Sequence, residues 1–248
     1  MVKKALIIPD CHIPYEDKRA YELMLAVGKD IDPDEIVILG DYADFYGLSS
    51  HGKDAGITEL FEDELFAVIE RLKELKRLFP LASIVYCEGN HEYRLPRYLN
   101  KNCGELYKAV TVPKLLMLDH MGIEFIPYGP NQQYAILGSK LIARHEPLGG
   151  GEHCAASTVK KAGKSVIFGH THRIQEAQIV TIDGDNYRGI STGWLGDKNH
   201  PVFDYVKNHH QWAQGFSELT VMKDGTWFNN LIHIIDHKCN YNGNIYIN

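Results

Sequence analysis

Two histidines separated by one residue, His170 and His172, follow a short apolar run in the stretch IFGHTHRI. Imidazole nitrogens are common ligands of transition metals. Two histidines on a polar loop need no metal, however, so the pair alone does not separate the two interpretations. A metal site requires matching ligands elsewhere in the chain, at positions that the fold brings together.

Ligand-type side chains also follow four other apolar runs that we expect to be strands. They are Asp10 and His12, Asp41 and Asp44, Asn90 and His91, and His145. In an extended segment, residues two apart face the same side, so Asp10 and His12 can reach one ion while Cys11 points away. Ligand sites of open α/β sheets lie outside the carboxyl ends of the strands, where all these residues are expected.

Strands and helices alternate in the first 90 residues. The apolar runs KALIIPD, EIVILGD and ASIVYCEGN predict buried strands, and helical spacing of apolar residues predicts helices over 18–30 and 57–79. Strands separated by helices pair in parallel, so the fold class is α/β, or α+β in some schemes.

The remainder of the chain predicts a second group of strands. Residues 93–119 have a helical, irregular pattern, and 154–163 predicts a helix. Runs within 123–146, the run 164–169 and most of the chain beyond residue 173 are strand-like, with Asp-Gly turns. We expect two layers of sheet with helices outside, in a single domain spanning 1–248, because no linker or repeat interrupts the pattern.

Composition restricts the function classes. A net charge of -6 disfavours nonspecific wrapping of nucleic acid, although a local basic groove is compatible with it. Five scattered cysteines without a Cys-x-x-Cys pair disfavour a disulfide framework and a zinc ribbon, and fit a reducing compartment. No apolar run approaches the length of a membrane span, so we expect a cytoplasmic protein without membrane partners.

The polar strand ends, taken in order, resemble the calcineurin-like metallophosphoesterases. The family pattern is Asp-x-His, Gly-Asp-x-x-Asp, Gly-Asn-His-Asp/Glu, a lone His and Gly-His-x-His. The matching residues are Asp10 and His12, Gly40, Asp41 and Asp44, Gly89 to Glu92, His145, and Gly169, His170 and His172. The resemblance implies a metallophosphoesterase four-layer β-sandwich flanked by helices.

The resemblance also implies two divalent metal ions and the residues that bind them. One ion would be held by Asp10, His12 and His172, the other by Asn90, His145 and His170, and Asp41 would bridge them. Nitrogen and oxygen ligands without thiolates suit Mn²⁺ best, with Fe, Zn²⁺, Ni²⁺ or Mg²⁺ as alternatives. The implied activity is hydrolysis of a phosphoester by a metal-bound hydroxide.

Three further residues have roles that the resemblance implies or leaves open. His91 would face the substrate as a general acid or a positive charge, and Asp44 would orient it. Arg94 could clamp the phosphate beside Asn90, because Phe45 and Tyr46 replace the Arg-Gly of the protein phosphatases; the alternative is an arginine on a solvated helix face. His153 rivals His145 as the lone histidine, and we prefer His145 because it directly follows a strand.

Several substrates fit this interpretation. A nucleotide-type phosphodiester or phosphomonoester ranks first, and nuclease activity second, because Arg94, Arg97 and Lys101 could follow a nucleic-acid backbone. A phosphoprotein phosphatase ranks lower for want of the usual arginine. A non-catalytic scaffold ranks last, because the ligands and His91 are all kept. Specificity is expected from residues 41–54, 93–119 and 146–154.

Overall fold

The computed structural model describes residues 2–50, 60–204, 206 and 209–248. Its first sheet has the strand order β11-β10-β1-β2-β3-β4. The strands are β1 (Lys3–Ile8), β2 (Glu35–Ile38), β3 (Ser83–Cys87), β4 (Ile123–Ile126), β10 (Gly215–Val221) and β11 (Trp227–His233). The first four are mutually parallel, as the alternation of strands and helices predicts, and β10 and β11 extend the sheet in antiparallel fashion.

A second sheet has the order β5-β6-β7-β9-β8. Its strands are β5 (Tyr134–Ala135), β6 (Ile142–Arg144), β7 (Val166–Phe168), β8 (Ile174–Val180) and β9 (Asn186–Thr192). β6, β7 and β9 are parallel, so their carboxyl ends meet at one edge. One of the strand-like runs expected within 123–146, at residues 133–138, is confined to β5, because a 3-10 turn (Ile136–Gly138) follows it directly.

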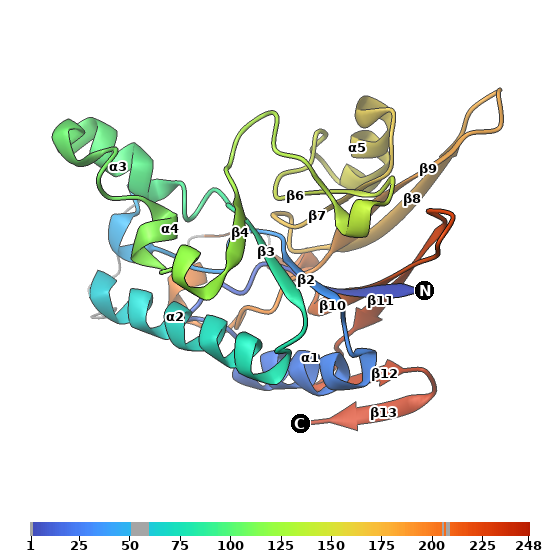
Figure 1. Ribbon diagram of the computed structural model, residues 1–248, viewed down its shortest axis with the longest axis horizontal. Coiled ribbons are helices and arrows are strands. Elements are labelled where there is room, and N and C mark those ends of the chain that lie inside the picture. Colours follow the sequence, from blue (N-terminus) through green and yellow to red (C-terminus); the bar gives the residue numbers. More distant parts are fainter. Residues whose placement is uncertain (1, 51–59, 205, 207–208) are drawn as a thin grey trace.

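The two sheets pack face to face and helices cover their outer faces (Figure 1). Ile7 and Val37 of the first sheet pack with Ile167 and Ile190 of the second in one buried cluster. Helices α1 (Lys18–Ile31) and α2 (Phe61–Leu78) pack on the other face of the first sheet, and α5 (Cys154–Ala162) packs on the second. The four-layer α/β architecture is therefore confirmed.

The segment between β3 and β4 contains the helices α3 (Arg94–Asn102) and α4 (Val112–Leu115). The 3-10 turns elsewhere are Tyr46–Leu48, Gly104–Leu106, Asp119–Met121, Pro201–Phe203 and His209–Gln211. Residues 51–54 of the expected specificity loop and 57–59 of the expected helix lie outside the described residues. Within the described part, no helix has the length and apolar character to cross a membrane.

The last two strands form a hairpin whose position in the fold the sequence did not predict. Its strands, β12 (Lys238–Tyr241) and β13 (Asn244–Ile247), lie against α1. The hydroxyl of Tyr246 donates to Asp30, and Asn248 Nδ2 donates to Glu22 at 2.7 Å. These contacts join the hairpin to a helix more than 200 positions earlier in the chain. No local sequence pattern reveals a contact between segments so far apart.

Candidate metal centre and active site

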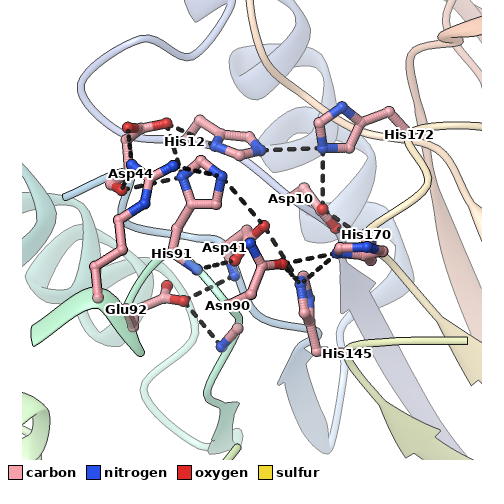
Figure 2. Close-up of polar contacts among 12 residues, drawn as sticks. Asp10, His12, Asp41, Asp44, Asn90, His91, Glu92, His145, His170 and His172 are labelled. Atoms are coloured by element: carbon pink, nitrogen blue, oxygen red, sulfur yellow. Dashed lines mark hydrogen bonds and ion pairs between the residues drawn. The ribbon is translucent and has the colours of Figure 1, made fainter. Parts of the chain in front are cut away.

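The predicted site residues meet at the carboxyl ends of five strands, three from the first sheet and two from the second. Asp10 follows β1, Asp41 follows β2 and Asn90 follows β3, while His145 follows β6 and His170 follows β7. Parallel pairing within each sheet brings these ends to one edge, and stacking of the sheets brings the two edges together. Figure 2 shows the side chains pointing toward one another.

Asp10, His12 and His172 form the first donor set. His12 Nε2 lies 3.1 Å from His172 Nε2, which lies 3.2 Å from Asp10 Oδ2. All three side chains are buried, and one ligand atom from each lies within 4.8 Å of the others. Ligand atoms about 2.1 Å from one ion and at right angles are separated by about 3.0 Å, so these separations fit a shared cation.

Asn90, His145 and His170 form the second donor set, with Asp41 at its side. Asn90 Oδ1 lies 2.8 Å from His145 Nε2 and 2.7 Å from His170 Nδ1. His145 Nε2 is also 3.3 Å from Asp41 Oδ2. The other Asp41 oxygen, Oδ1, accepts the backbone N–H of His91 at 2.8 Å, so Oδ2 is the oxygen turned toward the histidines.

Charge in the centre favours cations. Burial raises the pKa of Asp10 and of Asp41, but the neighbouring histidines outweigh it and leave both carboxyl pKa values below their usual range. Burial lowers the pKa of His145, yet the charges of Asp41 and Asp10 raise it to about 10. Ionised carboxylates facing imidazole nitrogens, with no thiolate among them, make a donor set that fits divalent transition metals.

Asp44 connects three side chains at the edge of the first donor set. Its Oδ2 lies 2.8 Å from His12 Nδ1 and 3.1 Å from His91 Nδ1, and its Oδ1 accepts a hydrogen bond from Arg94 Nη1 at 3.1 Å. The contact with His91 is the one that the sequence predicted, whereas the contact with His12 was missed. A carboxylate that accepts from Nδ1–H leaves Nε2 of His12 unprotonated and able to bind a metal.

Arg94 and His145 are both in the centre. The Arg94 side chain is 14 % exposed, so it does not lie on a solvated helix face. Its Nη1 also donates to the Asp44 carbonyl at 3.0 Å, and its Nη2 lies 3.1 Å from His91 Nε2. His145 is fully buried in the second donor set, while its rival His153 is exposed and stands at the N-cap position of α5 without a side-chain capping hydrogen bond.

The backbone at the strand ends turns sharply. His12, Asp41, His170 and His172 all have left-handed backbone, with φ between 46° and 63°. Such conformations cost free energy in non-glycine residues and persist where surrounding contacts hold them. The sequence predicted an extended segment from Asp10 to His12, and this is wrong because His12 has left-handed backbone; both side chains still reach the same donor set.

Two glycines of the motifs are required by close approach. A Cβ at Gly169 would lie 2.1 Å from Asp10 Oδ1, and a Cβ at Gly89 would lie 2.2 Å from both the backbone nitrogen and Oδ1 of Asp41. In each case the glycine leaves room for a carboxylate of the neighbouring strand end. The glycines that precede Asn90 and His170 in the motifs are thus required for a steric reason.

Glu92 holds the strand ends in place from beneath (Figure 2). Its fully buried carboxylate accepts the backbone N–H groups of Asp41, Ala43 and Gly89 and the hydroxyl of Tyr86, at 2.6–3.0 Å. It does not belong to either donor set. One side chain thereby fixes the turns after β2 and β3 relative to each other.

Comparison with known proteins identifies the family. The model of the calcineurin-like phosphoesterase family matches residues 3–174. The chain belongs to this family. Membership makes it a phosphoester hydrolase with residue clusters that can hold metal, and the matched region contains every member of both donor sets.

Individual relatives are distant. The gene 54 proteins of the Mycobacterium phages L5 and D29 are 28% and 27% identical to this member of the calcineurin-like phosphoesterase family, over 89% of this chain and 90% of theirs. Among solved structures, the phosphoesterase Yfce from E. coli is 16% identical over 92% of this chain and 98% of its own, with a TM-score of 0.43. The Pseudomonas putida nuclease MPE is 15% identical over 91% and 87%, with a TM-score of 0.38.

Trp194, Trp212 and Gln132 contact histidines of the site although they lie outside the family motifs. The Trp194 ring stacks on the imidazole of His172 with centroids 4.8 Å apart, and Trp212 meets it edge-on at 4.4 Å. Gln132 Oε1 accepts the backbone N–H of His145 at 2.8 Å. The tryptophans follow β9 and precede β10 outside the family motifs, so only their position one strand away from the motif strands could have indicated them.

Proposed function

We propose that this phosphoester hydrolase works with two divalent cations, Mn²⁺ in first place. Asp10, His12 and His172 would hold one, Asn90, His145 and His170 the other, and Asp41 would lie between them as a bridge. The observation that supports this most directly is that two nitrogen and oxygen donor sets converge at the same strand ends, with Asp41 Oδ2 3.3 Å from His145 Nε2 of the second set. Such a pair of ions activates water and neutralises charge on a phosphoryl group.

His91 is the proposed proton donor to the leaving oxygen. Burial lowers its pKa, but the Asp41 and Asp44 carboxylates raise it above the ordinary histidine value. Asp44 holds Nδ1, so Nε2 is the nitrogen available to a substrate. Proton donation of this kind contributes about 10²–10⁴-fold to rate.

Arg94 is the proposed phosphate ligand, together with Asn90. Its Nη2 faces His91 Nε2, and this positive charge opposes protonation of the imidazole. A substrate phosphate that draws the guanidinium onto itself removes that opposition. Binding of the phosphate and protonation of His91 are thereby coupled, because the same movement of the Arg94 guanidinium binds the phosphate and takes its positive charge away from the imidazole.

We place the substrate among nucleotide-type phosphodiesters or phosphomonoesters, acted on in the cytoplasm by a single domain spanning 1–248. Five cysteines without a disulfide among the described residues agree with a reducing compartment. Nuclease activity is the second candidate, and basic residues on α3 favour it. The test is turnover of bis(p-nitrophenyl) phosphate and p-nitrophenyl phosphate after reconstitution with Mn²⁺.

The Asp41→Asn variant serves as the blank, and Asp185→Asn, in the exposed turn after β8, serves as the matched control. We expect turnover of at least one ester by the wild type and the control and none by Asp41→Asn. His91→Ala should keep its Mn²⁺ and lose about 10²–10⁴-fold in rate. Wild-type turnover equal to that of Asp41→Asn, with metal bound, would refute the proposal.

A further inference from the structure

A groove runs along α3 away from the metal centre. Its volume is about 560 Å³, and it is lined by Asn90, from the turn after β3, and by Arg94, Arg97, Tyr98 and Lys101 of α3. Asn90 belongs to the second donor set and Arg94 contacts Asp44 and His91, so the groove opens directly onto the centre. We call it the α3 groove.

The charge of the α3 groove is positive although the chain as a whole carries -6. Arg97 and Lys101 are exposed, and within the described residues no carboxylate lies within ion-pair distance of either. On α2, by contrast, Lys73 and Arg77 pair with glutamates of their own helix. Cations left unpaired beside an active site favour an anionic ligand over a structural role.

Spacing along the helix indicates more than one phosphate. Arg94, Arg97 and Lys101 are three and four residues apart, so they lie on one face. At 1.5 Å of rise per residue, Arg94 and Lys101 are about 10 Å apart along the helix, which is too far to grip one phosphate. Tyr98, 45% exposed between them, offers a ring on which a base can stack.

We propose that the α3 groove binds a single-stranded nucleic acid, with the phosphate to be cleaved at Arg94 and the flanking phosphates on Arg97 and Lys101. This proposal rests on the proposed function of the centre. Water adds to phosphorus, one bridging P–O bond breaks, and the departing oxygen takes a proton. The products are one strand end with a phosphate monoester and one with a hydroxyl.

Binding is tested first, without metal, so that it does not depend on hydrolysis. The probe is a fluorescein-labelled 12-residue oligodeoxythymidylate, titrated in EDTA at several salt concentrations and followed by anisotropy. The test variant is Arg97→Ala/Lys101→Ala. Lys73→Ala/Arg77→Ala is the matched control, since it removes one lysine and one arginine, also four residues apart, from exposed positions on α2.

We expect the slope of log affinity against log salt to fall in magnitude by about 1.4 in the test variant, at about 0.7 per lost phosphate contact. The control should keep the wild-type slope. Tyr98→Ala should weaken binding about 5- to 150-fold with the slope unchanged, because stacking carries no charge. Equal affinities in test variant and wild type, or equal losses in test variant and control, would overturn the proposal. Tighter binding of the matching duplex would overturn the single-stranded assignment.

Cleavage is tested second, with Mn²⁺, using the same oligonucleotide and bis(p-nitrophenyl) phosphate. We expect the ratio of oligonucleotide to small-diester turnover to fall in the test variant and to stay constant in the control. An oligonucleotide that is bound but never cut, while the small diester is hydrolysed, overturns the substrate assignment. If the wild type does not hydrolyse the small diester, the proposed function is refuted instead, and the binding result is unaffected.

Discussion

Replacing Asp44 with asparagine tests whether its carboxylate acts mainly on His12, a proposed metal ligand, or on His91, the proposed acid. Its Oδ2 serves both His12 and His91, at 2.8 and 3.1 Å, and its Oδ1 serves Arg94. Asparagine has a single acceptor oxygen, and its NH₂ group cannot accept a proton from a ring N–H. If the NH₂ group takes the place of Oδ2, both imidazoles lose their acceptor; if the amide oxygen takes that place, both keep only a neutral acceptor and the NH₂ group faces the Arg94 guanidinium.

If His12 loses the partner, its proton moves to Nε2 and covers the nitrogen that faces His172. Loss of such a partner typically lowers metal affinity or activity about 10- to 100-fold. If His91 loses it, its Nδ1 keeps only the Asp44 backbone carbonyl, at 3.0 Å, and the carboxylate charge that raises the pKa of His91 is gone, so the rate should fall by up to about 10²–10⁴-fold. We expect Asp44→Asn to show at least a tenfold drop in Mn²⁺ affinity or in turnover at saturating Mn²⁺.

The assay pairs Mn²⁺ titration against a competing chelator with turnover of bis(p-nitrophenyl) phosphate at saturating metal. Asp185→Asn is the control, and circular dichroism verifies that both variants are folded. A drop in affinity alone assigns Asp44 chiefly to His12, whereas a drop in saturated turnover alone assigns it to His91. Unchanged affinity together with unchanged turnover contradicts the role that the hydrogen bonds give to Asp44.

Two further predictions concern a steric contact and a buried acid. Gly169→Ala places a Cβ against Asp10, so Mn²⁺ affinity should drop at least tenfold, whereas Gly104→Ala, which meets nothing within 4 Å, should not change it. Burial, with the charge of Asp44, raises the pKa of Glu64 to about 7. Because the folded state holds that proton longer, wild-type stability falls as pH rises from about 4.5 to 7. Glu64→Gln should lack this fall and gain up to about 3 kcal/mol relative to wild type across that window, measured by urea unfolding in EDTA; parallel pH profiles would contradict it.

Much of the fold was predictable because its signals are local. Continuous apolar runs predicted β1, β2 and β3, and helical spacing predicted α1 and α2. The position of the terminal hairpin was not predictable in this way, because it depends on contacts with α1, far away in the chain. The strand β5 is shorter than its apolar run because a 3-10 turn begins directly after it, which the apolar pattern did not indicate.

For the candidate site, the identity of the residues could be predicted from the sequence, but several of their contacts could not. The sequence by itself determined which residues stand at the strand ends, because each apolar strand and the glycines and ligand-type residues after it are adjacent in the chain. Only the tertiary structure decided that Asp44 serves both His12 and His91, that Arg94 faces inward, and that Glu92 joins the turns after β2 and β3. These contacts depend on how neighbouring strand ends and α3 are placed, since a hydrogen bond is decided by tenths of an ångström that no local pattern encodes.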